Sequence, residues 1–145
     1  MARKFGEIAF TTEVKAAQAQ RGSRETYERY IANGAANDTI TPNLADFIQT
    51  LDGFYFGTVS DSGYPYIQFR GGPAGFLQVL DDKTLGFADF AGNVQYITVG
   101  NLSTHPHAFL FLMDYRHQRR IKVWGKANYV EDDAALVEKL RMPGY

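Results

Sequence analysis

Arg70 is the residue of this chain whose position most suggests chemistry. It lies in the alternating segment PYIQFRG (65–71), on the same strand face as Gln68. A partly buried arginine needs an anionic partner, and its planar guanidinium suits a phosphate or a carboxylate. The residues leave both partners open: a bound phosphate, or an aspartate of a neighbouring strand such as Asp89.

A second candidate is the turn Ala91-Gly92-Asn93 within FADFAGNVQYITVGNL (87–102). The pattern predicts a strand, this turn, and a helix that begins near Asn93. Backbone N–H groups at a helix start attract anions, and Gly92 would let a ligand approach closely. The same residues also suit a plain capped helix, because Asn is a favoured capping residue.

Two other groups of residues are weaker candidates for a functional site. The basic residues around the turn at 115–118 suit an exposed hairpin tip, or an anion contact across a dimer interface. His105 and His107 alone do not predict a metal, since zinc sites need three or four ligands and the chain has no cysteine. No nucleotide-binding or hydrolase motif is present. The basic residues are Arg116, Arg119, Arg120 and Lys122.

The composition narrows the class of protein. Fifteen basic residues against sixteen acidic ones give a net charge of -1, which argues against a nucleic-acid-binding protein. No apolar run approaches the ~20 residues of a membrane span, and the first residues lack the apolar segment of a secretory signal. We therefore expect a cytoplasmic protein without a membrane partner.

Hydrophobic spacing predicts the elements that position these residues. Residues 1–22 show no period and suggest an arm or a partly ordered tail. We expect one domain, with residues 1–40 as an N-terminal arm and helix, and 41–145 as a core with a C-terminal helix. The apolar segment 108–114 should be buried on both faces. Helices are predicted at 23–33, 41–53, 93–102 and 132–140, and strands at 54–60, 65–71, 75–80, 84–89, 108–114 and 120–130.

The order of these segments resembles a known family. GYPYIQFRGGPAGFLQVLDDKTLGFADFAGN, QYITVGNL, HPHAFLFLMDY and RRIKVWGKA together are similar to the pyridoxamine 5'-phosphate oxidase-like family of FMN-binding split barrels. The resemblance covers about residues 54–130. It implies a mainly β fold with flanking helices, a six-stranded antiparallel split barrel, and a homodimer that binds FMN at two sites between its subunits.

The resemblance also implies roles for individual residues. Arg70 would reach the FMN phosphate, and the turn after the fourth strand would hold it. The basic strand of the other subunit would lie near the ring. The implied function is an FMN-dependent oxidoreductase acting on an unknown small molecule, with no general acid or base that the sequence places. The implied cofactor residues are Gln68, Phe69, Arg70, Phe87, Ala88, Asn93, Val94, Gln95, and Arg119 or Arg120.

Val94 departs from the family pattern, which usually has an arginine beside the asparagine of the turn. Losing one charge-assisted hydrogen bond costs about 1.5–3 kcal/mol, a tenfold to hundredfold loss of affinity. Val94 thus favours one alternative, a non-catalytic flavin-binding or dimeric ligand-binding module. Another alternative is a split barrel that uses deazaflavin or haem, with His107 or His117 as the iron ligand.

Overall fold

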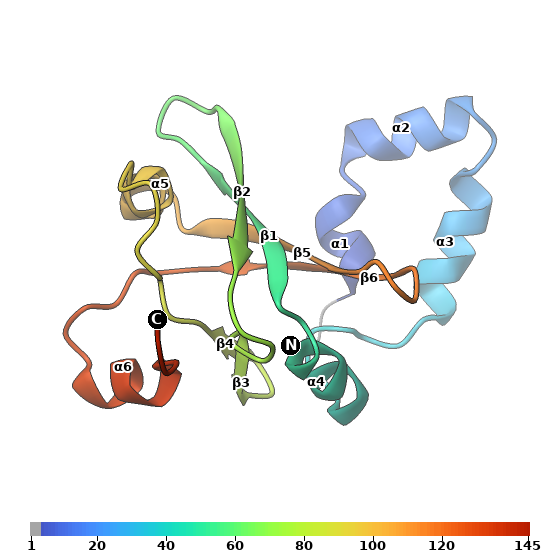
Figure 1. The fold of residues 1–145 in the computed structure, drawn as a ribbon. Helices are drawn as coiled ribbons and strands as arrows, with labels where there is room; N and C mark the ends of the chain where they lie inside the picture. The colour runs from blue at the N-terminus through green and yellow to red at the C-terminus, as the bar shows by residue number, and fades with distance from the viewer. Residues whose placement is uncertain (1–3) are drawn as a thin grey trace. The chain divides into compact units, whose positions relative to one another are not determined.

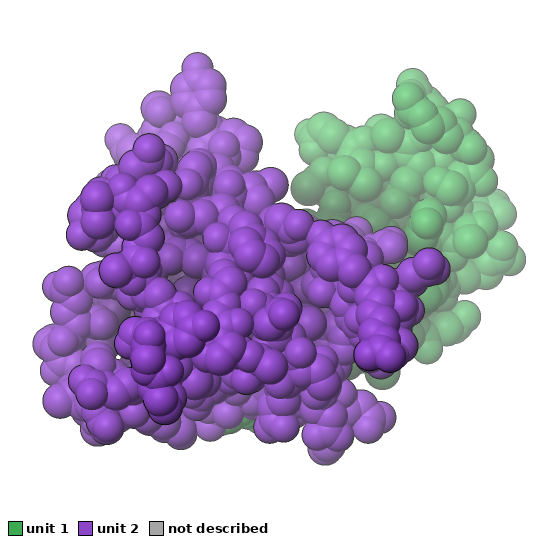
Figure 2. Space-filling model, in the orientation of Figure 1, with its two compact units in different colours: residues 1–41, 81–83 green, residues 42–80, 84–145 purple. Residues whose placement is uncertain are grey.

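The structure is a computed structural model that describes residues 4–145 (Figure 1). These residues form two compact units, 4–41 with 81–83, and 42–80 with 84–145 (Figure 2). The first boundary lies directly after Thr41.

The first unit contains three helices, α1 (Phe5–Ala9), α2 (Thr12–Gln20) and α3 (Arg24–Asn33). Lys4 Nζ donates to the carbonyl of Ile31 at 2.6 Å, which places a positive charge at the C-terminal end of α3. Residues 4–22 are thus largely helical where the sequence showed no period. The reason is visible in α2, which buries none of its residues and needs no apolar stripe. Residues 1–3 of the predicted arm lie outside the described residues.

The second unit is built on a four-stranded antiparallel sheet with the order β2-β1-β5-β6 (Figure 1). A separate two-stranded sheet pairs β3 with β4. The prediction of six strands is confirmed. The strands are β1 (Gly53–Val59), β2 (Pro65–Gly71), β3 (Gln78–Asp81), β4 (Thr84–Gly86), β5 (His107–Asp114) and β6 (Arg119–Lys126).

The expected closed barrel is not observed, because no strand pairing joins the two sheets within residues 4–145. β3 and β4 have only four and three residues. Residues 87–89, predicted as the end of the fourth strand, form no ladder. The second sheet thus stays a short, separate ladder of two strands.

One face of the four-stranded sheet, here called the inner face, carries the core. Phe54 and Phe56 of β1 are 1% and 3% exposed, and Leu110 and Leu112 of β5 are buried beside them. The helix α4 (Pro42–Gln49), predicted at 41–53, adds the buried side chains of Phe47 and Ile48. Apolar burial of this extent is the main stabilising contribution to the unit.

The opposite face, here called the outer face, is apolar but open. Ile67 and Phe69 of β2 are 70% and 58% exposed. The prediction that β5 is buried on both faces is wrong for this chain, because Phe109 and Phe111 are only half-buried. The outer face consists of Tyr55, Ile67, Phe69, Phe109, Phe111 and Trp124, whose strand positions place them on one side of the sheet.

Two glycines seat an aromatic ring on the outer face. Gly53 and Gly71 face each other across β1 and β2. A Cβ at Gly53 would collide with the ring of Phe69, and one at Gly71 would lie 3.1 Å from it. The absence of side chains at both positions therefore lets the ring of Phe69 lie close against the backbone.

Two further helices belong to this unit, α5 (Ile97–Thr104) and α6 (Ala134–Leu140). Asp133 caps α6 by accepting from the backbone N–H of Leu136 at 3.0 Å. Leu140 is buried and packs beside Gly86 of β4. Across residues 4–145, no helix combines the length and the apolar character needed to cross a membrane.

Candidate functional site

Arg70 lies at the end of β2 on the inner face, where it pairs across the strands with Phe54. Its side chain is 16% exposed and forms an ion pair from Nη1 to Oδ1 of Asp89. The guanidinium carbon lies 6.0 Å from the ring centroid of Phe87, close enough for a cation–π interaction. Of the two partners that the sequence left open, the carboxylate is thus present.

Arg70 keeps further capacity to bind an anion. Its Nε atom is buried and has no hydrogen-bond partner among residues 4–145. A buried donor that lacks an acceptor lowers the stability of the fold. A second acceptor at this atom would therefore stabilise the site. Binding of a phosphate at Arg70 remains a prediction.

Tyr129 belongs to the same group, although the sequence did not indicate it. Burial raises the pKa of its hydroxyl, and the negative charge of Asp89 raises that pKa further. The hydroxyl therefore keeps its proton and can donate a hydrogen bond at neutral pH. Arg70, Asp89 and Tyr129 come from three segments, β2, the loop after β4 and the loop after β6, which explains why no local pattern connects them.

Gln68 lies two residues before Arg70 on the inner face. Its Oε1 accepts a hydrogen bond from Oγ1 of Thr98, at 3.1 Å, in the first turn of α5. Nearby, Nδ2 of Asn101 donates to Oγ1 of Thr58 at 2.9 Å, and both groups are buried. These polar pairs attach α5 to the sheet and orient the Gln68 amide.

The turn after β4 differs from the prediction, because α5 begins at Ile97 and not at Asn93. The side chain of Asn93 accepts from the backbone N–H of Gln95 at 3.2 Å and closes a local turn. Val94 and Tyr96 adopt φ values of 54° and 55°, in the left-handed region. A left-handed residue interrupts a right-handed helix, so the helix starts only after Tyr96.

The consequence is that the predicted anion turn is an exposed loop rather than a helix N-terminus. Asn93, Val94 and Gln95 are all exposed. Val94 is 66% exposed, and the left-handed region is especially costly for a β-branched residue. The loop offers backbone N–H groups and two amide side chains, without a positive charge of its own.

The structure does not gather all the predicted residues. Phe87 and Ala88 are half-buried in the segment that leads to Asp89. Phe69 projects from the outer face, away from the side that carries Arg70. Arg119 instead contacts Asp114, at 2.9 Å from Nη2 to Oδ2, and lies 5.1 Å from the ring of Phe47. Arg120 is exposed opposite Met113.

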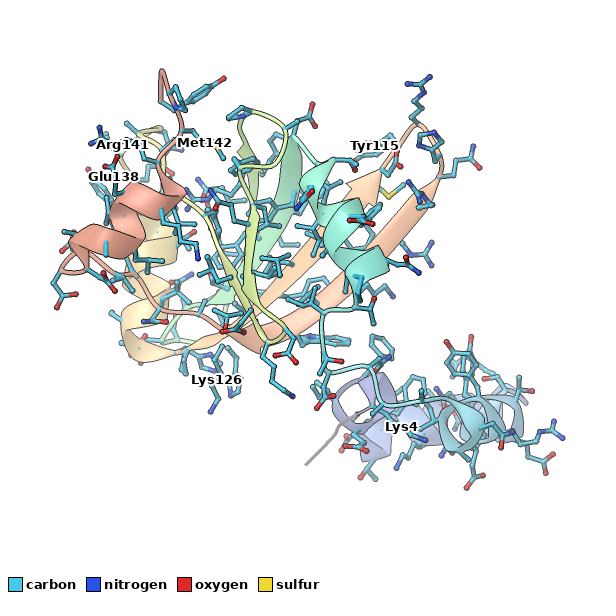
Figure 3. The ribbon with its side chains drawn as sticks, turned by 90° about the horizontal axis from the view of Figure 1, so that it is seen from below. Lys4, Tyr115, Lys126, Glu138, Arg141 and Met142 are labelled. Atoms are coloured by element: carbon cyan, nitrogen blue, oxygen red, sulfur yellow. The ribbon has the colours of Figure 1, made fainter. Side chains whose placement is uncertain are left out.

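The turn between β5 and β6 forms its own polar cluster. Hydrogen bonds from Arg119 and then from His117 lower the pKa of Asp114 to about 2. The hydroxyls of Tyr55 and Tyr115 lie 2.6 Å apart, and this hydrogen bond raises the pKa of Tyr115. Figure 3 shows Tyr115 at this turn and Lys126 toward the other end of β6. The basic residues here form an exposed hairpin tip, one of the two alternatives from the sequence.

Metal ligation has little support in residues 4–145, where no three candidate side chains lie together in a way that could hold a metal. The rings of His105 and His107 lie 5.4 Å apart in an edge-to-face arrangement. This pair alone is short of the ligand number that a zinc site requires.

Comparison with known proteins places this geometry in context. A family model described as pyridoxamine 5'-phosphate oxidase matches residues 40–143. No curated protein matches the chain. A solved structure of an FMN-binding protein from Syntrophomonas wolfei subsp. wolfei is similar, with 12% identity and a TM-score of 0.49, over 84% of this chain and 78% of that chain.

Proposed function

Because the chain belongs to the pyridoxamine 5'-phosphate oxidase family, we propose that it binds FMN and acts as an oxidoreductase on a small molecule. The observation that carries the proposal is Arg70, a largely buried cation with an unpartnered Nε beside the Phe87 ring. An arginine of this kind fits a phosphate monoester. FMN, when bound, supplies hydride or electron transfer.

Residues of the inner face and of the loops after β4 and β6 supply the remaining contacts in this proposal. Arg70, Asn93 and Gln95 bind the phosphate through one charge and two amides. Gln68 presents its amide N–H groups to the ribityl or the ring, because its Oε1 is already engaged by Thr98. The hydroxyl of Tyr129 can donate beside them, since its raised pKa keeps it protonated.

The proposed functional unit is a homodimer that uses the outer face. Tyr55, Ile67, Phe109 and Phe111 line an apolar hollow on this face. An open apolar patch of this kind is typical of an interaction site in a soluble protein. A second copy supplies a matching apolar surface, and its Arg119 or Arg120 would complete a cofactor site between the subunits.

A titration of flavin fluorescence tests FMN binding. The protein is added to FMN in steps, and absorbance between about 350 and 500 nm is recorded in parallel, since a bound flavin changes both signals. Saturable quenching supports the proposal. A fluorescence signal that stays constant up to protein concentrations that saturate a control flavoprotein contradicts it.

Val94→Arg tests the role of the exposed turn. The added cation should tighten FMN binding about tenfold to hundredfold, with a steeper dependence on salt. Val94→Gln is the matched control, because it also removes the β-branched residue from the left-handed position but adds no charge. Equal affinities of the two variants would show that the side chain points away from the phosphate.

A further inference from the structure

We infer that Asp89 determines whether this site prefers a flavin with a phosphate over a flavin without one. The inference depends on the proposed flavin site and adds a residue that sets its specificity. In the structure the guanidinium of Arg70 is paired with the Asp89 carboxylate. An incoming phosphate must therefore share or displace that carboxylate.

The charges of the group explain why this competition matters. Arg70 and Asp89 cancel each other, Tyr129 is neutral, and Asn93, Val94 and Gln95 carry no charge. Their net charge is zero, whereas the phosphate of FMN brings up to two negative charges. The Arg70 side chain is 16% exposed and the Asp89 side chain 26%, although Asp89 as a whole lies in an exposed loop position, so solvent weakens the charge of the carboxylate without removing it.

The loop that carries Asp89 makes displacement feasible. Residues 87–95 form no helix or strand. The positive φ of Val94 adds a local strain to the same segment. A segment without ladder hydrogen bonds can shift at lower cost than a strand, so Asp89 can leave Arg70 when a stronger acceptor arrives.

The measurable quantity is the preference ratio, defined as the dissociation constant of riboflavin divided by that of FMN. Riboflavin has the same ring and ribityl chain without the phosphate, so the ratio isolates the phosphate contribution. In the unmodified protein Asp89 offsets Arg70, and we expect a ratio within about tenfold of one. Both constants come from fluorescence titrations, so no turnover is required.

Three variants complete a double-mutant cycle. Asp89→Asn frees Arg70 and should raise the ratio by about tenfold to hundredfold, the effect of one charge-assisted hydrogen bond. Arg70→Gln leaves Asp89 facing the phosphate and should lower the ratio below one. The double variant is neutral again and should return close to the unmodified ratio.

Two controls separate charge from other effects. Asp61→Asn removes the same charge in the exposed turn between β1 and β2, at the far end of β2 from Arg70, and should leave the ratio unchanged. Asp89→Glu keeps the charge and should also keep the ratio low. If the preference ratio rose as much in Asp61→Asn as in Asp89→Asn, the inference would be overturned, because the change in net charge alone would then explain the rise.

The possible failures are distinguishable. Absence of binding for both flavins contradicts the proposed function. Binding of both flavins with the same ratio in Asp89→Asn and the unmodified protein overturns the inference alone. If Asp89→Asn does not fold, Arg70→Gln decides: a ratio below one supports the role of Asp89, and a ratio of one or more overturns it.

Discussion

The two faces of the four-stranded sheet are made by the same strands but differ in burial. On the inner face, Phe54 and Phe56 are at most 3% exposed. On the outer face, Ile67 and Phe69 are at least 58% exposed. An antiparallel sheet with one solvated face usually carries polar residues on that face. Here the centre of the outer face is apolar as well, which is why we propose that a second copy covers it.

The faces also differ in where their polar groups lie. The inner face holds the pairs of Arg70 with Asp89 and Gln68 with Thr98 among its aromatic residues. On the outer side, the cations Arg120 and Lys122 lie on β6, at one edge of an apolar centre. The comparison is the basis for two separate proposed roles, ligand binding on the inner face and association through the outer face.

The largest expected effect is on the inner face, in Phe54→Ala. This side chain is 1% exposed and stacks on Phe76 with ring centroids 5.6 Å apart. Its removal should lower the free energy of unfolding by about 3–5 kcal/mol, measured by urea denaturation. Tyr64→Ala, at a residue 75% exposed, is the control and should cost under about 1 kcal/mol. Similar losses in the two variants would contradict the contrast in burial.

The next largest effect is on the outer face, in Ile67→Glu. A charge in the apolar hollow should raise the dissociation constant of the homodimer at least about thirtyfold, as loss of an interface hot spot does. Sedimentation velocity over a range of concentrations measures it. Val137→Glu on α6, at a residue 45% exposed, should leave association unchanged. A monomer at every concentration in the unmodified protein would refute the role of this face.

A smaller effect is expected for Asn101→Ala, which removes the partner of Thr58. The buried hydroxyl of Thr58 would then lack its hydrogen bond, at a cost of about 1–3 kcal/mol in unfolding free energy. Replacing both residues, Thr58→Val with Asn101→Leu, should cost less than the sum of the single changes, because no polar group remains unpaired. If the losses of unfolding free energy in the single variants added up to the loss in the double variant, the two residues would act independently.

The smallest effect is the contribution of Asp114 to acid stability. Its pKa in the folded protein, about 2, is below the ordinary value of 3.8, so the carboxylate stabilises the fold above pH 3.8. That contribution disappears as the pH falls from 3.8 to about 2. Asp114→Asn should flatten this part of the curve of unfolding temperature against pH, by a small amount because the cluster is exposed. An unchanged curve would exclude Asp114 as a source of the pH dependence.

Much of the sheet could be predicted because its signals are local. The alternation in 65–71 predicts β2 with its bounds as observed, and the Thr41-Pro42 start predicts α4. The predicted start of α5, Asn93, was four residues too early. The left-handed conformations of Val94 and Tyr96 that delay the helix cannot be recognised from the types of these residues. Closure into a barrel also failed as a prediction, since it depends on pairing between distant strands.

In the candidate site, too, features with a local sequence signal could be predicted, and features that depend on tertiary contacts could not. Arg70 stood out because a cation within an apolar alternating strand needs a partner, and Asp89 was one of the two partners weighed. Tyr129 could not be predicted from the sequence, since the electrostatic effect of Asp89 on it depends on how the two loops fold. Thr98 also depends on tertiary contact, because its bond to Gln68 spans 30 residues.

The glycine pair beneath Phe69 has a consequence for association. A ring that lies close against Gly53 and Gly71 has few rotamers to lose, although it is 58% exposed. Ordering a mobile side chain at an interface costs about 0.5–1.5 kcal/mol, and a preordered ring avoids most of that cost. In the proposed homodimer, Phe69 would therefore enter the subunit contact with much of its conformational freedom already lost during folding.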